Sequence, residues 1–148
     1  MIAAIQRVSG AHVEVDNEVV GKISNGFLIL LGVFKDDDES DAKFLADKIS
    51  VLRVFQDENK NMNLSLQDVD GSVLVVSQFT LCGDWRKGRR PGFQKAARPE
   101  EANRLYGYFS NLIKQKNIPV ETGVFGAMMN VTLTNEGPVT FVMDSKEK

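Results

Sequence analysis

Two short segments of this sequence carry the residue types of a site built from hydroxyl, amide and main-chain groups. The first is Ser77-Gln78-Phe79-Thr80-Leu81, and the second is Asn135-Glu136-Gly137-Pro138-Val139-Thr140. Each segment is expected where a strand meets a turn. The two segments therefore predict a site that depends largely on the main chain.

Conventional nucleophilic catalysis has few residues to draw on. A Ser-His-Asp arrangement would need His12, the single histidine, and a thiol nucleophile or soft metal ligand would need Cys82, the single cysteine. His12 lies in an alternating strand pattern, which favours an exposed or packed histidine, and Cys82 is interpreted as an inert, buried thiol. Thr80 is either a nucleophile or an ordinary β-branched strand residue. The second interpretation is favoured because no base is adjacent in the sequence.

A cluster of positive charge stands out in an otherwise acidic chain. Six cations and no acid occur between positions 86 and 98, which leaves the rest of the chain, whose total formal charge is −2, at about −8. On a turn rich in glycine and proline, beside Trp85 and Phe93, these cations can bind phosphates while the rings stack on bases. A loop that only adds solubility is the alternative. The cations are Arg86, Lys87, Arg89, Arg90, Lys95 and Arg98.

The charge balance and composition limit the class of protein. A chain that coats long nucleic acid would normally be basic overall, so a phosphate-bearing partner that docks locally fits better than DNA. With 148 residues, 43% hydrophobic and 26% charged, the sequence predicts one compact domain over 1–148. A lone cysteine forms no internal disulfide, and no signal peptide or membrane-spanning run is recognisable. We therefore expect a soluble cytoplasmic protein with no membrane partner.

The first 34 residues have the pattern of strands joined by tight turns. Turn residues occur at Ser9-Gly10, Asp16-Asn17 and Asn25-Gly26, and the last pair is a strong hairpin signal because both residues tolerate positive φ. Later, Val73-Leu74-Val75-Val76 reads as a buried strand that delivers Ser77 to Thr80 to its end. The expected strands are 2–8, 12–15, 19–24, 27–33, 72–79, 120–122, 127–134 and 139–143.

Two helices are predicted from apolar residues at helical spacing. The first covers 40–52 and is preceded by the acids 36–39, which suit a helix N-terminus and, in the alternative, would be a divalent metal site. The helix interpretation is favoured, and no metal site is expected, because no spaced ligand loop accompanies the acids. The second begins at Pro99 and extends to Ile113. The predicted fold is a mixed α/β domain with a curved or barrel-like β-sheet and two main helices packed on it.

Four blocks in this order and at these distances resemble the signature of D-aminoacyl-tRNA deacylases, also called D-tyrosyl-tRNA deacylases. The similarity extends from Met1 to the C-terminus. The blocks are Ser77-Gln78-Phe79-Thr80-Leu81, then Lys87-Gly88-Arg89-Arg90-Pro91 with Phe93, then Gly123-Val124-Phe125-Gly126-Ala127-Met128-Met129, and finally Asn135-Glu136-Gly137-Pro138-Val139-Thr140.

The resemblance implies a hydrolase that cleaves the ester of D-aminoacyl-tRNA, and of mischarged glycyl-tRNA, as chiral proofreading in translation. It implies a homodimer in which Gly137 and Pro138 of one subunit, joined by a cis peptide, enter the active site of the other. There their carbonyl oxygens would hold the substrate's α-amino group, while an L side chain would run into the backbone. Water would attack with help from the ribose 2′-hydroxyl of the terminal adenosine, without metal or organic cofactor.

The resemblance also assigns roles to residues. Ser77, Gln78, Phe79 and Thr80 would form the catalytic segment, with backbone N–H groups near Phe79 and Thr80 as oxyanion donors. Phe125 and Met129 would line the adenosine pocket, with apolar core as their alternative. The tRNA would be held by Arg86, Lys87, Arg89 and Arg90. Two other functions compete with this one: an RNA-binding module without catalysis, and a general esterase that does not depend on RNA.

Overall fold

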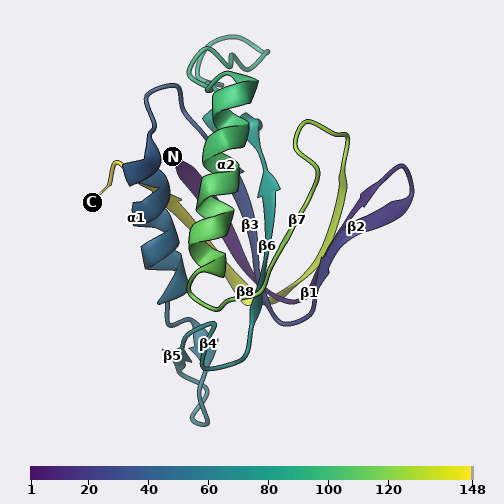
Figure 1. Ribbon diagram of the computed structural model, residues 1–148, viewed down its shortest axis with the longest axis vertical. Helices are drawn as coiled ribbons and strands as arrows, with labels where there is room; N and C mark the ends of the chain where they lie inside the picture. Colours follow the sequence, from purple (N-terminus) through teal and green to yellow (C-terminus); the bar gives the residue numbers. More distant parts are fainter. Residues whose placement is uncertain (148) are drawn as a thin grey trace.

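The computed structural model describes residues 1–147 and shows a curved sheet with two helices on one face (Figure 1). The sheet order is β2-β1-β3-β6-β7, and β8 pairs with the other edge of β1. Its strands are β1 (Ile2–Val15), β2 (Glu18–Ile23), β3 (Gly26–Gly32), β6 (Ser72–Ser77), β7 (Val120–Thr122) and β8 (Asn130–Asp144). The helices are α1 (Glu39–Ser50) and α2 (Pro99–Lys114), and a small second sheet pairs β4 (Phe55–Gln56) with β5 (Met62–Leu64).

The long strand β1 curves the sheet toward a barrel. Its first half pairs with β3, its second half pairs with β2, and β8 follows it along nearly its whole length. At the far side, β2 lies against β7 so closely that a Cβ atom added at Gly21 would be 2.4 Å from the carbonyl oxygen of Thr122. The predicted mixed α/β domain with a curved, barrel-like sheet is therefore confirmed.

Two predicted turns are wrong, because the chain continues as strand through both. At Ser9-Gly10, β1 goes on with an irregular register against β8 instead of turning back. At Gly137-Pro138, β8 is also continuous, and its register against β1 shifts between Gln6 and Val8. Proline is tolerated inside a strand at such irregularities, where no ladder hydrogen bond is lost. A turn signal read locally cannot reveal a bulge, since the bulge depends on the partner strand.

The helices cover one face of the sheet and close the main core. Leu45 and Ile49 of α1 and Leu105 and Phe109 of α2 are fully buried in the same cluster as Phe27 of β3. A second, smaller cluster lies on the opposite face of the sheet. Strands β3 and β6 are thus buried on both faces, which explains their nearly unbroken apolar sequences.

The acidic run 36–39 starts a helix, as predicted. Asp38 is the N-cap of α1: its side chain accepts from the Ser40 amide at 2.8 Å, and Asp41 returns a hydrogen bond to the Asp38 amide at 3.0 Å. This reciprocal arrangement is a capping box. The helix ends at Ser50, two residues before the predicted end. The second helix, Pro99–Lys114, closely follows its prediction.

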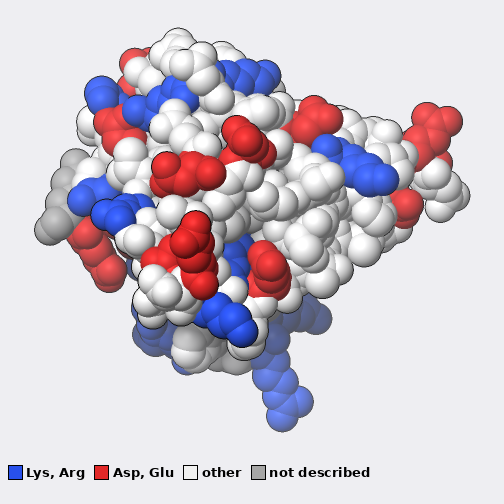
Figure 2. All heavy atoms as spheres, turned by 90° about the horizontal axis from the view of Figure 1, so that it is seen from below, with Lys and Arg blue, Asp and Glu red and all other residues white. Residues whose placement is uncertain are grey.

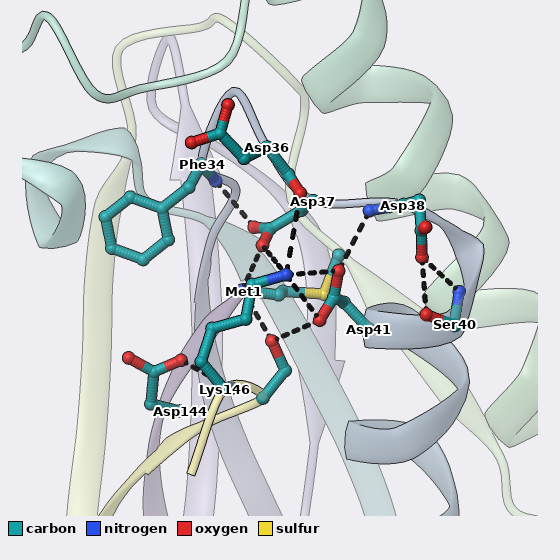
Figure 3. A network of polar contacts seen from close by, with 10 residues as sticks. Met1, Phe34, Asp36, Asp37, Asp38, Ser40, Asp41, Asp144 and Lys146 are labelled. Carbon is teal, nitrogen blue, oxygen red and sulfur yellow. Dashed lines mark hydrogen bonds and ion pairs between the residues drawn. The ribbon is translucent and has the colours of Figure 1, made fainter.

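A buried polar network ties the start of β1 to α1 and to the end of β8 (Figure 3). The α-amino nitrogen of Met1 donates to Asp37 at 2.6 Å and to the Ser145 hydroxyl at 2.7 Å. Ser145 in turn donates to Asp41 at 2.8 Å, and the Lys146 ammonium lies 2.8 Å from the same carboxylate. In the described part of the chain, no buried side-chain nitrogen or oxygen atom lacks a hydrogen-bond partner, which is what burial of polar atoms requires.

Candidate active site

The catalytic segment predicted from sequence lies where β6 leaves the sheet. Strand β6 runs parallel to β3, with Ser77 opposite Leu31, and the Gln78 amide donates to the Leu31 carbonyl at 2.8 Å. The predicted strand 72–79 is two residues too long, because Phe79–Cys82 form a 3-10 turn instead. This turn redirects the chain away from the core, so that Phe79 and Thr80 are exposed.

Two backbone N–H groups precede the first hydrogen bond of this turn. That bond runs from the Leu81 amide to the Gln78 carbonyl at 3.2 Å, and the Gln78 side chain makes no capping bond. The first amides of any helical turn lack partners within it, so those of Phe79 and Thr80 are available as donors. A pair of adjacent N–H donors beside an open surface is the arrangement that stabilises an oxyanion.

The Thr80 hydroxyl is oriented by its neighbour. The Gln78 side-chain amide donates a short hydrogen bond to Thr80 Oγ1. The oxygen therefore acts as an acceptor, and its own proton is free to be donated outward. His12, the only imidazole, lies within β1 and contacts Glu14 at 3.7 Å. The favoured sequence interpretation, that Thr80 is an ordinary strand residue, is wrong about the local structure, because Thr80 lies in the 3-10 turn Phe79–Cys82.

Cys82 is an inert thiol. It is buried behind the 3-10 turn, and this burial, together with the negative charge of Asp37, raises the pKa of the thiol to about 11. Thiolate is the reactive form, so a cysteine with this pKa stays protonated near neutral pH. Within residues 1–147 no group of three or more His, Cys, Asp or Glu side chains is placed to hold a metal ion.

The second segment is exposed and braced from behind. Glu136, Gly137 and Pro138 lie at the surface, and the Gly137-Pro138 peptide bond is cis. Asn135 brackets the segment: its amide nitrogen donates to the Val139 carbonyl at 2.9 Å, and its amide oxygen accepts from the Val139 nitrogen at 3.1 Å. These contacts fix both ends of the exposed dipeptide.

Arg7 also braces this segment, and the sequence interpretation missed it. Its side chain is buried, and its Nε donates to the Glu136 carbonyl at 2.9 Å. A second nitrogen donates to the Val54 carbonyl at 2.5 Å. The available signal was a lone cation within the apolar strand 2–8, since a buried charge needs partners that face it.

Within one chain the two segments lie apart. Ser77 of β6 pairs with Leu31 of β3, and Leu31 pairs with Ala3 of β1. On the other edge of β1, Gly137 of β8 lies between Asn135, which pairs with Val8, and Thr140, which pairs with Gln6. The segments are therefore separated by three strand spacings across the sheet and about four residues along it, roughly 15–20 Å in all. A substrate atom at Phe79 cannot touch Gly137 of the same chain.

Phe125 and Met129 lie at the same edge as the catalytic segment. Strands β6 and β7 are parallel, and the Gly123 amide donates to the Val75 carbonyl at 3.2 Å, so the connection 123–129 leaves the sheet beside Ser77. The Phe125 ring packs on Tyr106 with centroids 6.0 Å apart, and both predicted side chains are half-buried. Phe125 packs against the main core, whereas Met129 packs against the smaller cluster on the other face of the sheet.

The basic loop is a small hairpin attached to the catalytic turn. Asp84 and Gly92 exchange backbone hydrogen bonds of 2.7 and 2.9 Å, and the next residue, Phe93, packs edge-on against Phe79 at 5.0 Å. The hairpin lies at the top in Figure 1, while Figure 2 views the opposite end, where acidic and basic side chains alternate. The exposed cations of the hairpin are Arg86, Lys87, Arg89 and Arg90.

This combination defines a class of protein: an α/β domain in which a 3-10 turn with two available main-chain N–H groups adjoins a hairpin with four exposed cations. Neither helix in the described part of the chain has the length and apolar character needed to cross a membrane. Comparison with known proteins narrows the class. A family model described as D-Tyr-tRNA(Tyr) deacylase matches residues 4–144.

The chain belongs to the D-aminoacyl-tRNA deacylase family. It is 58% identical to the D-aminoacyl-tRNA deacylase of Bacillus pumilus, covering 99% of this chain and 100% of that one. It is 57% identical to the Thermus aquaticus protein of the same name, covering 100% and 97%. A solved structure of a c-Myc DNA Unwinding Element Binding Protein is 37% identical, with a TM-score of 0.92 and coverage of 97% and 98%.

A more distant structure shares the fold. A probable eukaryotic D-amino acid tRNA deacylase aligns with a TM-score of 0.80 over 97% of this chain and 98% of its own, at 18% identity. The agreement of family model, full-length relatives and fold confirms the resemblance that the four sequence blocks carried.

Proposed function

We propose that this deacylase reads the chirality of its substrate with main-chain groups from a second copy of the chain. As a member of its family, the protein is a hydrolase that cleaves the ester of D-aminoacyl-tRNA, releasing the free D-amino acid and tRNA. The observation that carries the proposal is the separation, within one chain, of Gly137 from the catalytic turn at Phe79. A homodimer that places this dipeptide over the partner's turn would complete the site.

The gate works by steric exclusion. Gly137 and Pro138 are exposed. Arg7 holds the residue before them, Glu136, and Asn135 holds the residue after them, Val139, so the dipeptide presents a firm surface. Its carbonyl oxygens accept hydrogen bonds from the substrate's α-ammonium group. A D side chain then points away, whereas an L side chain meets backbone atoms that cannot move aside. Because no side-chain pocket is used, many D residues pass, and so does achiral glycine on a non-cognate tRNA.

The chemistry requires little from side chains, since an aminoacyl ester is already activated. The amides of Phe79 and Thr80 stabilise the oxyanion, and one such donor typically contributes about 10²–10³ in rate. Water attacks with assistance from the 2′-hydroxyl of the terminal ribose, and Ser77, Gln78 and Thr80 hold substrate or water. In this proposal the chain supplies the N–H donors and the binding side chains, the tRNA supplies the 2′-hydroxyl, and no metal or organic cofactor takes part.

The tRNA lies across the basic hairpin. The terminal adenosine rests between Phe125 and Met129, and the cations Arg86, Lys87, Arg89 and Arg90 hold the phosphates of the acceptor end. Since the hairpin packs on Phe79, binding of the acceptor end and positioning of the ester are coupled through one contact. Because charged tRNA is used in translation in the cytoplasm, we propose that the enzyme acts there.

The central experiment compares D-tyrosyl-tRNA with L-tyrosyl-tRNA. Rapid loss of the D ester alone supports stereospecific hydrolysis. Unchanged esters together with measurable tRNA binding would favour an RNA-binding module instead. Replacing the terminal ribose by its 2′-deoxy form separates the deacylase from a general esterase, because an esterase that ignores the ribose should be unaffected.

Subunit mixing tests the dimer. One variant carries Gly137→Val, which damages the gate, and the other carries Thr80→Pro, which removes a donor N–H. If the gate of one copy completes the site of its partner, exchanging subunits restores one working site in each mixed dimer. The result that contradicts the proposal is a mixture as inactive as each variant alone, provided that mass measurement shows mixed dimers.

A further inference from the structure

Trp85 is an exposed aromatic residue for which neither the fold nor the reaction supplies a reason. It is 78% exposed, although tryptophan has the largest apolar side chain and is usually well buried. It follows directly after the residue that closes the basic hairpin, Asp84. A large ring left in water at a defined place beside cations indicates a surface for a ligand rather than a packing residue.

The surroundings of Trp85 fit a nucleic acid strand. The next two residues, Arg86 and Lys87, are exposed cations, and Arg89 and Arg90 follow across the tip of the hairpin. In this hairpin only Asp84 opposes them, and its carboxylate lies 3.4 Å from Arg86. An aromatic face flanked by positive charge is the arrangement that binds unpaired nucleotides, because the cations hold phosphates while the ring stacks on a base.

The position of Trp85 identifies which nucleotides it can reach. Phe93 contacts Phe79 of the catalytic turn. The path from Phe93 to Trp85 consists of the peptide unit to Gly92, the backbone pairing of Gly92 with Asp84, and the peptide unit from Asp84 to Trp85. This path is at most roughly 13 Å long. Because the ester is proposed to lie at the catalytic turn, a nucleotide that Trp85 can reach at this distance would be one of the unpaired nucleotides next to the terminal adenosine.

We propose that Trp85 stacks on an unpaired nucleotide of the tRNA acceptor end, immediately before the terminal adenosine, and thereby guides the ester to the catalytic turn. The inference rests on the proposed use of the hairpin for tRNA. It adds a single-stranded partner and a residue that recognises it by its π-face. Stacking of this kind tolerates any base, so one enzyme can accept many tRNAs.

The chain provides its own probe, since Trp85 is its only tryptophan. Intrinsic tryptophan fluorescence of the full-length protein therefore reports on this one ring. We expect saturable quenching by a short oligoribonucleotide that copies the unpaired acceptor end, and much weaker quenching by a blunt RNA duplex of equal charge. Fluorescence that does not change when the oligoribonucleotide is added would overturn the proposal. So would fluorescence that changes with protein concentration alone, because a second copy of the chain would then cover the ring.

Binding of deacylated tRNA gives the matched mutational test. Trp85→Ala should raise the Kd at least about fivefold, and Trp85→Phe should recover most of the loss, because removal of one stacked ring typically has an effect of this size or larger. Met62→Ala, an exposed apolar change on β5 at the opposite end, is the control and should leave the Kd unchanged. Since deacylated tRNA contains no ester, this result is independent of whether stereospecific hydrolysis is observed.

Trimming the tRNA locates the contact. The effect of Trp85→Ala should disappear when the unpaired 3′ nucleotides are removed from the tRNA. An equal loss on intact and trimmed tRNA would place the ring against the paired stem and refute the inference, as would an unchanged Kd on intact tRNA.

Discussion

The Nε atom of Arg7 donates a hydrogen bond to the carbonyl oxygen of Glu136 at 2.9 Å, directly before the exposed Gly137. The same side chain reaches the Val54 carbonyl from a second nitrogen, and it is buried. One residue of β1 thus holds the exposed dipeptide of β8 from the interior of the molecule. This contact links the stability of the fold to the shape of the proposed gate.

Replacing Arg7 tests that link. Arg7→Ala leaves the buried Val54 carbonyl without its donor, and a buried unsatisfied group costs about 1–3 kcal/mol, so urea unfolding should show a clear loss of stability. Arg7→Lys offers a single ammonium in place of the guanidinium fork. We expect the lysine variant to recover part of the stability but little of the kcat/KM for D-tyrosyl-tRNA. Wild-type kcat/KM in Arg7→Lys would show that the fork does not shape the gate.

A side chain at Gly137 should damage the gate itself. A Cβ atom there would lie 2.4 Å from the Val139 nitrogen, so the backbone must shift in Gly137→Ala. We expect kcat/KM for the D ester to fall by about a hundredfold or more, because small displacements in a positioned site have effects of this size. The ratio of D to L hydrolysis should fall as well.

The control for this change is Gly107→Ala on α2, where an added Cβ has open space around it. This variant should be fully active. If Gly137→Ala were as active and as selective as Gly107→Ala, the dipeptide would have no part in the site.

The hydroxyl of Thr80 should be dispensable for the chemical step. It accepts a hydrogen bond from the Gln78 side chain, and we propose that it is a binding group rather than the nucleophile, so Thr80→Ala should retain activity within about tenfold in single-turnover assays. Removal of a true catalytic nucleophile costs far more, about 10⁶ in a serine protease. A loss approaching that size in a folded Thr80→Ala variant, with activity restored in Thr80→Ser, would show that the Thr80 hydroxyl is the nucleophile.

The cations of the hairpin should be visible in the salt dependence of tRNA binding. Each phosphate contact adds about 0.7–0.9 to the slope of log K against log salt, so Lys87→Ala should reduce the slope by nearly that amount. Lys114→Ala is the matched control, because this lysine ends α2, roughly 24 Å from the end of the helix that adjoins the hairpin. Equal slopes for the two variants would argue against phosphate contacts at Lys87.

Acid should weaken the fold through Asp41. Burial alone would raise the pKa of this carboxyl, but hydrogen bonds from Lys146, the Asp38 amide and Ser145 together lower it to about 2 from its ordinary value of 3.8. The folded state therefore gains stability above about pH 4, which is lost as the pH falls toward 2. The contribution at neutral pH is at most about 2 kcal/mol.

Denaturation of Asp41→Asn at several pH values measures this contribution. The variant should be less stable than wild type at pH 7, and the difference should vanish near pH 2. Asp47→Asn, which alters an exposed carboxylate paired with Lys43 and Lys116, should change little, since surface pairs contribute at most about 1 kcal/mol. A difference for Asp41→Asn that does not depend on pH would exclude the charge as its cause.

The sequence alone determined what depends on local periodicity and local turn chemistry. Helical spacing located the helix Pro99–Lys114, and the acids before α1 predicted the start of that helix. The apolar run before Ser77 predicted a buried strand, and the order of the four blocks identified the family. The exposed cations of the hairpin also followed from composition, because six positive charges in one segment cannot be buried.

Only the tertiary structure decided what depends on strands that are distant in sequence. The pairing of β1 with β8 turned two predicted turns into irregular strand and placed Arg7 behind Glu136. The sheet order also set Gly137 far from Phe79, which no local pattern contains. The physical reason is that register and strand order are fixed by which surfaces pack and pair across the whole chain, while a sequence window reports only the conformations its own residues prefer.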